Sequence, residues 1–283
     1  MHVDCPSITA RRVAVRRATH QVLDDPKIFD DPLALRILGL DLGSSRDRNW
    51  LEDTPLARVL RGSMAARSRH AENMLKEARQ RGVDQYVVLG AGLDTFACRH
   101  AAVDNGGLRI FEVDHPDTQA WKRQSLRLAG IAVPNHCTFV PMDFEHQTLA
   151  EGLRQSGFDL SRPAFFSWLG VVMYLTADAI DATLLTVAAL PTGSGIVFDY
   201  MVVPELLSPA ARAVFDRLAS QVATAGEPFQ TFFTPPLLAS HLRELGFGRI
   251  DDMSPTALDA RYFQNRADNL RAGKLAHLIT AWV

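Results

Sequence analysis

The chain has 283 residues, 47% hydrophobic and 22% charged, a composition typical of one large globular domain or two small ones. Its 30 Lys and Arg against 32 Asp and Glu argue against a nucleic-acid partner, because phosphate contacts require a basic excess. Three scattered cysteines form no CxxC pair, which predicts no metal site and no disulfide framework and fits a cytoplasmic location. No stretch reaches the roughly 18 apolar residues that span a bilayer, so we expect no membrane partner.

The first 80 residues carry a helical pattern interrupted by short polar loops. Small and apolar side chains recur there at the spacing of one helix face. They are Met64, Ala71, Met74, Leu75 and Ala78. We therefore expect an N-terminal helical cap or lid at residues 1–80, followed by a core at residues 81–283.

Seven short apolar runs follow, each the length of a strand. They cover residues 86–89, 108–114, 138–142, 164–168, 195–200, 248–253 and 277–283. Helical patterns separate them, among them one at 204–221 that begins a helical insertion at about 204–236. Strands that alternate with helices imply right-handed crossovers. The sequence thus predicts an α/β fold with a seven-stranded, mostly parallel sheet and helices on both faces.

The first apolar run leads directly into the turn Gly90-Ala91-Gly92-Leu93-Asp94-Thr95. Glycines allow a ligand to approach the backbone closely, and ligands of such sheets bind at the carboxyl ends of the strands. Thr95 stands where the dinucleotide pattern GxGxxG has its third glycine. The turn therefore indicates a ligand site but argues against a pyrophosphate ligand.

Acidic side chains end the next two apolar runs. Asp114 follows Gly92 by 22 residues, a position from which a carboxylate accepts both hydroxyls of a ribose, and Glu112 lies on the same strand face. The alternative for Asp114 is a surface carboxylate at a strand end. Asp143 either accepts from the exocyclic amine of a nucleoside base or caps a helix.

A series of short motifs runs in order along nearly the whole chain. They are Arg16-Arg17-Ala18, Phe29-Asp30-Asp31-Pro32, Arg67-Ser68-Arg69, the glycine turn, Glu112-Val113-Asp114-His115-Pro116, Val140-Pro141-Met142-Asp143, Gly170-Val171-Val172-Met173-Tyr174-Leu175, Phe198-Asp199-Tyr200 and Gly226-Glu227-Pro228-Phe229. In these motifs the chain resembles the leucine carboxyl methyltransferase-like family of S-adenosylmethionine (SAM)-dependent methyltransferases. That family includes bacterial small-molecule and polyketide O-methyltransferases.

The resemblance implies a Rossmann-like methyltransferase core with SAM (S-adenosyl-L-methionine) as its cofactor. Arg67 would clamp the methionine carboxylate, with Arg69 as the second candidate, because a guanidinium suits bidentate carboxylate recognition. Glu112 and Asp114 would hold the ribose, and Asp143 would face the adenine amine. The remaining implied cofactor contacts are Gly90, Ala91, Gly92, Asp94, Met142, Phe144 and Leu169.

The resemblance also implies a small-molecule acceptor, methylated on a carboxylate or a hydroxyl by in-line displacement. Tyr174 would lie beside the reactive methyl group or the acceptor. An ionised carboxylate needs no base, whereas a phenol does. Candidate bases are His115, Asp199 and His70, each with a structural alternative. Leu169 stands where many relatives carry glutamate, which points to an acceptor other than a phosphatase.

Two other functions remain open at this point. A nicotinamide (NAD(P))-dependent oxidoreductase is allowed by the glycine turn and Asp114, although Thr95 and the absence of a Tyr-x-x-x-Lys pair argue against it. A non-catalytic SAM-binding protein is the other alternative. Phe229, Phe232 and Phe233 either line an acceptor pocket or belong to the core, and a homodimer is one option for the oligomeric state.

Overall fold

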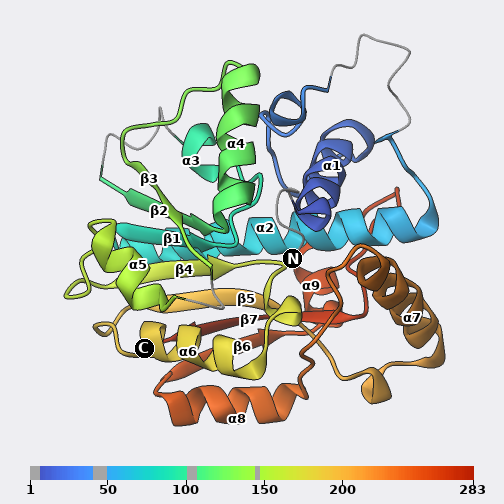
Figure 1. Ribbon diagram of the computed structural model, residues 1–283. Coiled ribbons are helices and arrows are strands. Elements are labelled where there is room, and N and C mark those ends of the chain that lie inside the picture. Colours follow the sequence, from blue (N-terminus) through green and yellow to red (C-terminus); the bar gives the residue numbers. More distant parts are fainter. Residues whose placement is uncertain (1–6, 41–49, 101–106, 144–146) are drawn as a thin grey trace.

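A single seven-stranded sheet forms the centre of the computed structural model, which describes residues 7–40, 50–100, 107–143 and 147–283 (Figure 1). The strand order is β3-β2-β1-β4-β5-β7-β6. The first five strands are parallel, and β7 is antiparallel to both of its neighbours. The strands are β1 Gln85–Leu89, β2 Arg109–Asp114, β3 Cys137–Pro141, β4 Ala164–Trp168, β5 Gly195–Met201, β6 Arg249–Met253 and β7 Ala276–Trp282. The predicted α/β fold is confirmed, with every strand within a few residues of its expected bounds.

Helices cover both faces of the sheet because successive strand residues alternate between two hydrophobic clusters. Val87 and Phe166 face the cluster that α5, α6 and α8 complete, whereas Val88 and Phe165 face the cluster that α2 and α9 complete. The α-helices are α1 Ile8–Leu23, α2 Pro55–Gln80, α3 Phe96–Arg99, α4 Pro116–Leu128, α5 Leu149–Gln155, α6 Ala177–Ala188, α7 Pro209–Thr224, α8 Pro235–Leu245 and α9 Pro255–Tyr262. Short 3-10 helices within the described stretches are η1 Arg36–Leu38, η3 Val172–Tyr174 and η4 Pro204–Leu206.

Several helix starts can be read from the sequence. Helices α2 and α7 begin at Thr54-Pro55 and Ser208-Pro209, where the hydroxyl accepts a backbone N–H and proline takes the first helical position. This signal corrects the helix expected at 204–221. The segment is instead η4 followed by α7, because Ser208 caps a new helix and Pro209 cannot continue an old one.

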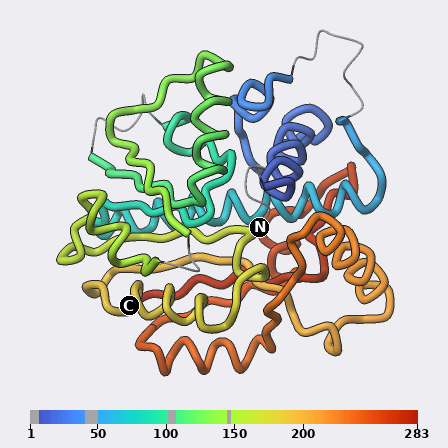
Figure 2. Tube along the Cα trace, viewed as in Figure 1, coloured from blue at the N-terminus to red at the C-terminus, as the bar shows by residue number. Residues whose placement is uncertain are grey.

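Helix α2 packs on the sheet as part of its core. Its residues Ala65, Met74 and Leu75 share a hydrophobic cluster with strands β1 and β4. Gly62 lies so close to the C-terminal part of the chain that a Cβ there would be 2.4 Å from the Arg271 carbonyl oxygen. Helix α2, light blue in the trace, and the red C-terminal segment therefore lie side by side (Figure 2). The expected boundary near residue 80 runs through this cluster.

A buried polar network attaches α1 to α2. Asp24 accepts hydrogen bonds from Nε and Nη2 of Arg61, at 2.7 and 2.9 Å, and lies 2.6 Å from His20 Nδ1. His20 Nε2 accepts two backbone N–H groups, so Nδ1 carries the proton that is donated to Asp24. Burial would raise the pKa of Asp24, but the hydrogen bonds from His20 and Arg61 lower it below its usual range. The first helix is thereby fixed beside the sheet.

The partly buried phenylalanines of the loop after α7 pack against the core. Phe229 and Phe232 pack on Phe215 of α7, with ring centroids 6.1 and 5.6 Å away. Phe233 contacts the buried ring of Tyr200 on β5. Across the four described stretches, no helix is both long enough and apolar enough to cross a membrane.

Candidate active site

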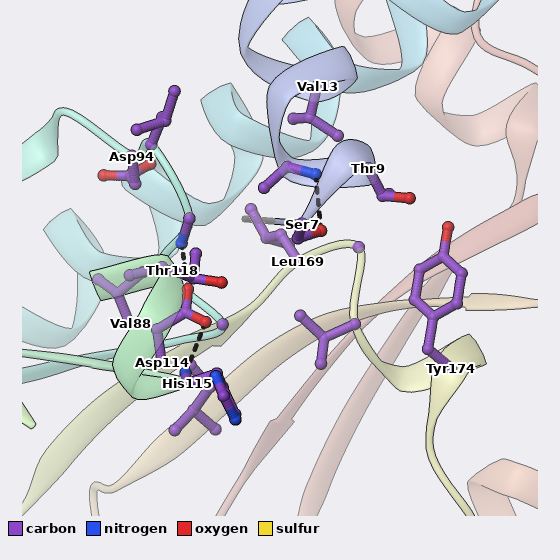
Figure 3. A pocket seen from close by; sticks show the side chains of 18 of the residues that line it. Ser7, Thr9, Val13, Val88, Asp94, Asp114, His115, Thr118, Leu169 and Tyr174 are labelled. Atoms are coloured by element: carbon purple, nitrogen blue, oxygen red, sulfur yellow. Dashed lines mark hydrogen bonds between the residues drawn. The ribbon is translucent and has the colours of Figure 1, made fainter. Parts of the chain in front are cut away.

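A cavity of about 680 Å³ lies at the carboxyl ends of the central strands, with α1 along one side (Figure 3). Its wall combines the glycine turn after β1, the end of β2, and the loops after β3 and β4. The first turns of α1, the part of α2 around Arg67 and the loop at 226–230 also line it. The cavity therefore joins segments that are far apart in the sequence, at the position where parallel sheets bind ligands.

The glycine turn forms the part of the wall nearest β1. Gly90 has a φ of +64°, and a Cβ there would lie 2.3 Å from Val171 Cγ2. A side chain at this position would need both a rare backbone conformation and space that Val171 already fills. The next strand is tied to the turn, because Gly92 N donates to Asp114 Oδ2 at 2.5 Å.

Asp114 reaches the cavity from the end of β2. Its other oxygen, Oδ1, accepts the backbone N–H of His115 at 2.7 Å. Burial raises the pKa of Asp114, and the two backbone hydrogen bonds counteract only part of that rise. Figure 3 shows His115 beside Asp114, on the opposite side of Leu169 from Tyr174.

Glu112 lies one pleat earlier and does not line the cavity. Its carboxylate is 2.5 Å from Lys122 Nζ of α4, and both side chains are 2% exposed. The Glu112 carboxylate, which we expected to bind a ribose, is therefore paired with Lys122. This arrangement gives no support to that role for Glu112, and it leaves Asp114 as the accessible acid of β2.

Arg67 of α2 contributes a positive charge to the wall. Its Nη1 is 2.7 Å from Asp199 Oδ2 of β5, and Gly170 N donates to Asp199 Oδ1 at 2.6 Å. Asp199 is thus engaged by two donors and does not line the cavity, so the arrangement does not support its expected role as a base. Arg69 is exposed and also lies outside the cavity.

Tyr174 lies at the other end of the cavity from Asp114 (Figure 3). Burial raises the pKa of Tyr174 to about 12, the Glu227 carboxylate adds to the rise, and Thr9 opposes it. Thr9 Oγ1 donates to Glu227 Oε2, so α1 and the loop at 226–230 meet beside this tyrosine. Glu227 belongs to the motif Gly226-Glu227-Pro228-Phe229, but no spacing in the sequence connects it with Thr9.

A second arginine anchors α1 to the glycine turn. Arg17 Nη2 pairs with buried Asp31 at 2.9 Å and donates to the Leu93 carbonyl at 2.9 Å. Arg17 also lies 3.4 Å from Asp94, and nearby cations, Arg17 first among them, hold the pKa of Asp94 low against the effect of burial. The sequence placed Arg17 in a motif without assigning it this function.

The cavity brings together most of the predicted residues. Those on its wall are Arg67, Gly90, Ala91, Gly92, Asp94, Asp114, His115, Met142, Asp143, Leu169 and Tyr174. Phe144 lies outside the described residues. His70 is buried between Tyr262 and Thr280, and burial lowers its pKa to about 4. It does not line the cavity, which argues against its role as a base.

Comparison with known proteins identifies the family. The model of the family described as leucine carboxyl methyltransferase matches residues 10–188, which include the glycine turn, Asp114 and Tyr174. The chain belongs to the leucine carboxyl methyltransferase family. A relative from Bacillus subtilis strain 168, YktD, is 33% identical over 298 aligned positions that cover 97% of each chain, and its name gives an inferred SAM-dependent methyltransferase activity. A similarly named Mycolicibacterium gilvum protein is 35% identical over 68% of this chain and 65% of its own.

Solved structures agree with the fold of this methyltransferase. One from Thermobifida fusca YX, titled as an inferred methyltransferase, has a TM-score of 0.58 at 20% identity and covers 99% of this chain and 96% of its own. A DUF574 family protein from Streptomyces avermitilis has a TM-score of 0.55 at 17% identity, with coverage of 95% and 96%. At these identities the likeness concerns the fold alone.

The methyltransferase uses SAM as its cofactor, as its relatives are named to do. The residues of the cavity fit this molecule. The volume of the cavity, about 680 Å³, lies within the range of small-molecule sites. Asp114 offers a carboxylate to a sugar, Arg67 offers a guanidinium to a carboxylate, and Gly90 leaves the wall without a side chain. Within the four described stretches, no group of three or more His, Cys, Asp or Glu is arranged to hold a metal ion.

Proposed function

We propose that this SAM-dependent methyltransferase methylates an oxygen, in a carboxylate or a hydroxyl, of a small molecule. The observation that carries the proposal is that one cavity contains two different ends. Asp114 and the glycine turn form one end, and Tyr174 with the loop at 226–230 forms the other. A volume of about 680 Å³ suits a cofactor with a small acceptor better than a folded partner protein.

In this proposal the chain grips the cofactor at three points. Asp114 accepts the ribose hydroxyls with the lone pairs that Gly92 and His115 leave available. Asp143 and Met142 border the adenine. Arg67, oriented by Asp199, donates to the methionine carboxylate.

The chain then needs to align the acceptor and exclude water. When bound, SAM supplies a methyl group that its sulfonium already activates. Leu169 presents apolar surface between the two ends of the cavity (Figure 3), and Val171 also lines the wall, which favours a dry reaction site. Tyr174 stays protonated at neutral pH because its pKa is about 12, so its hydroxyl is available as a hydrogen-bond donor to the acceptor.

Titration calorimetry separates this function from the two alternatives. We expect heat on addition of SAM and none with NAD, and we expect Asp114→Asn to weaken SAM binding about tenfold or more. Heat with NAD alone would favour the oxidoreductase. SAM binding without methyl transfer to a panel of phenols and carboxylates would instead favour the non-catalytic alternative. Native mass spectrometry of the purified protein gives an independent check through retained SAM or S-adenosylhomocysteine.

A further inference from the structure

The end of the cavity beside Tyr174 contains a carboxylate that takes no part in the proposed cofactor contacts. Glu227 lines the cavity and accepts a hydrogen bond from Thr9, which lies on the first turn of α1. Its charge acts on the Tyr174 hydroxyl and contributes to the raised pKa of that group. Three segments thus converge here, and Glu227 adds a carboxylate to the wall beside Tyr174.

The arginines of the cavity wall already have carboxylate partners other than Glu227. Arg67 pairs with Asp199, and Arg17 pairs with Asp31. Across the described stretches of the chain, no Lys, Arg or His forms an ion pair with Glu227. An acceptor that enters beside Tyr174 therefore meets a carboxylate that has no ion-pair partner among the described residues.

Two arginines act electrostatically on Tyr174. Arg67 of the wall opposes the rise that burial causes in the pKa of Tyr174, but it is paired with Asp199. Arg16 acts from outside the cavity. Arg16 interacts electrostatically with Tyr174 and Arg67, and also with Glu52. It does not line the cavity, so it does not offer a direct hydrogen bond to an acceptor there. Among the described residues, Glu227 supplies the carboxylate that lines the wall beside Tyr174, and this group can only accept.

We propose that Glu227 selects the acceptor, and that the site takes a neutral hydroxyl, a phenol or an alcohol, in preference to a carboxylate. This inference rests on the proposed O-methylation. A hydroxyl donates its proton to Glu227, whereas an ionised carboxylate has no proton to donate and is repelled by the like charge. Glu227 is therefore a specificity-determining residue and the proton acceptor of the reaction.

The transfer step balances with these groups. The acceptor oxygen forms a bond to the methyl carbon as the carbon–sulfur bond breaks, and that electron pair stays on sulfur. The proton of the acceptor hydroxyl moves to the Glu227 carboxylate and then to solvent. Thr9, which donates to Glu227 Oε2, holds the carboxylate in place before the acceptor arrives.

A binding experiment tests the assignment without requiring turnover. Calorimetry on the enzyme loaded with S-adenosylhomocysteine compares 2-naphthol with 2-naphthoic acid, which share a ring system and differ in the polar group. We expect the wild type to prefer 2-naphthol, and Glu227→Gln to shift the affinity ratio toward 2-naphthoate by about tenfold. Glu205→Gln removes the same charge from an exposed position on η4 and should leave the ratio unchanged.

Three results would overturn the assignment. One is tighter binding of 2-naphthoate by the wild type. Another is an affinity ratio that Glu227→Gln changes no more than Glu205→Gln does, including the case in which neither probe binds. The third is a tenfold loss of SAM affinity in Glu227→Gln with an unchanged ratio, which would assign Glu227 to the ammonium group of the cofactor.

The product linkage provides a separate readout. Methyl groups transferred from isotopically labelled SAM to a hydroxyl stay attached through mild alkali as ethers, whereas methyl esters release methanol. We expect retention of the label, and its release would contradict the hydroxyl acceptor. Failure of SAM to bind would instead contradict the proposed function, so the two failures can be told apart.

Discussion

Arg67 Nη1 on α2 lies 2.7 Å from Asp199 Oδ2 on β5, so a charge on the cavity wall is fixed by a residue that does not line the cavity. The Asp199 side chain is 9% exposed and also accepts the Gly170 backbone N–H. A guanidinium held in this way loses little freedom when it meets an anion. The pair therefore prepares Arg67 to bind a carboxylate.

Replacement of Arg67 by alanine should weaken SAM binding by about 2–5 kcal/mol, because the cofactor carboxylate would lose its charged partner. Titration calorimetry measures the change. Arg69→Ala, two residues along the same helix but exposed, is the matched control and should leave the affinity unaltered. Equal affinities for wild type and Arg67→Ala would remove Arg67 from the cofactor site.

Replacement of Gly90 by alanine should destabilise the fold and weaken SAM binding. The new Cβ would lie 2.3 Å from Val171 Cγ2, in a residue with φ of +64°. Gly82→Ala controls for the backbone conformation, since Gly82 has φ of +90° and a Cβ added there would meet no heavy atom within 4 Å. Urea unfolding should show about 1–3 kcal/mol more loss for Gly90→Ala than for Gly82→Ala. Equal losses would mean that Val171 moves aside freely.

Replacement of Arg17 by methionine should lower the free energy of unfolding by about 3 kcal/mol, because it leaves the buried Asp31 without its closest cation. Adding Asp31→Asn to that variant removes the uncompensated charge and should recover part of the loss. Urea titrations of the single and double variants measure both effects. A double variant that is less stable than Arg17→Met would show that Asp31 depends mainly on Arg99 and Thr95.

The buried His70 predicts a pH dependence of stability. Burial lowers its pKa from 6.5 to about 4 in the fold, so the unfolded chain binds the proton more readily. Its contribution is full above pH 6.5 and is lost as the pH falls toward 4. The loss should amount to about 3 kcal/mol. Measuring the free energy of unfolding of wild type and His70→Gln between pH 7 and 4 isolates the contribution of His70. The same dependence on pH in both proteins would contradict this prediction.

The sequence predicts the strands and the glycine turn because local patterns determine them. Apolar runs and Ser-Pro or Thr-Pro helix starts are visible within a few residues. Glu112 and Asp114 look equivalent by this logic, since they share a strand face. The two acids differ because Lys122 on α4 forms a buried ion pair with Glu112. Asp114, at the end of the strand, lines the cavity instead.

Contacts between distant segments could not be predicted in the same way. Arg67 and Asp199 are 132 positions apart, and Thr9 and Glu227 are 218 apart. No periodicity connects such pairs, because the packing of whole elements brings them together. The family resemblance supplied Arg67 as a ligand contact, but the partners that orient it and the carboxylate beside Tyr174 emerged only from the three-dimensional arrangement.

The contact of Gly62 with the Arg271 carbonyl limits how the chain can be recombined. Helix α2 and the segment before β7 leave no room between them for even a methyl group. A hybrid that takes its first 80 residues from another family member must therefore also take the matching stretch around residue 271. Exchange of the N-terminal part alone would pack α2 of one protein against the C-terminal segment of another, at a contact that leaves no room for a side chain.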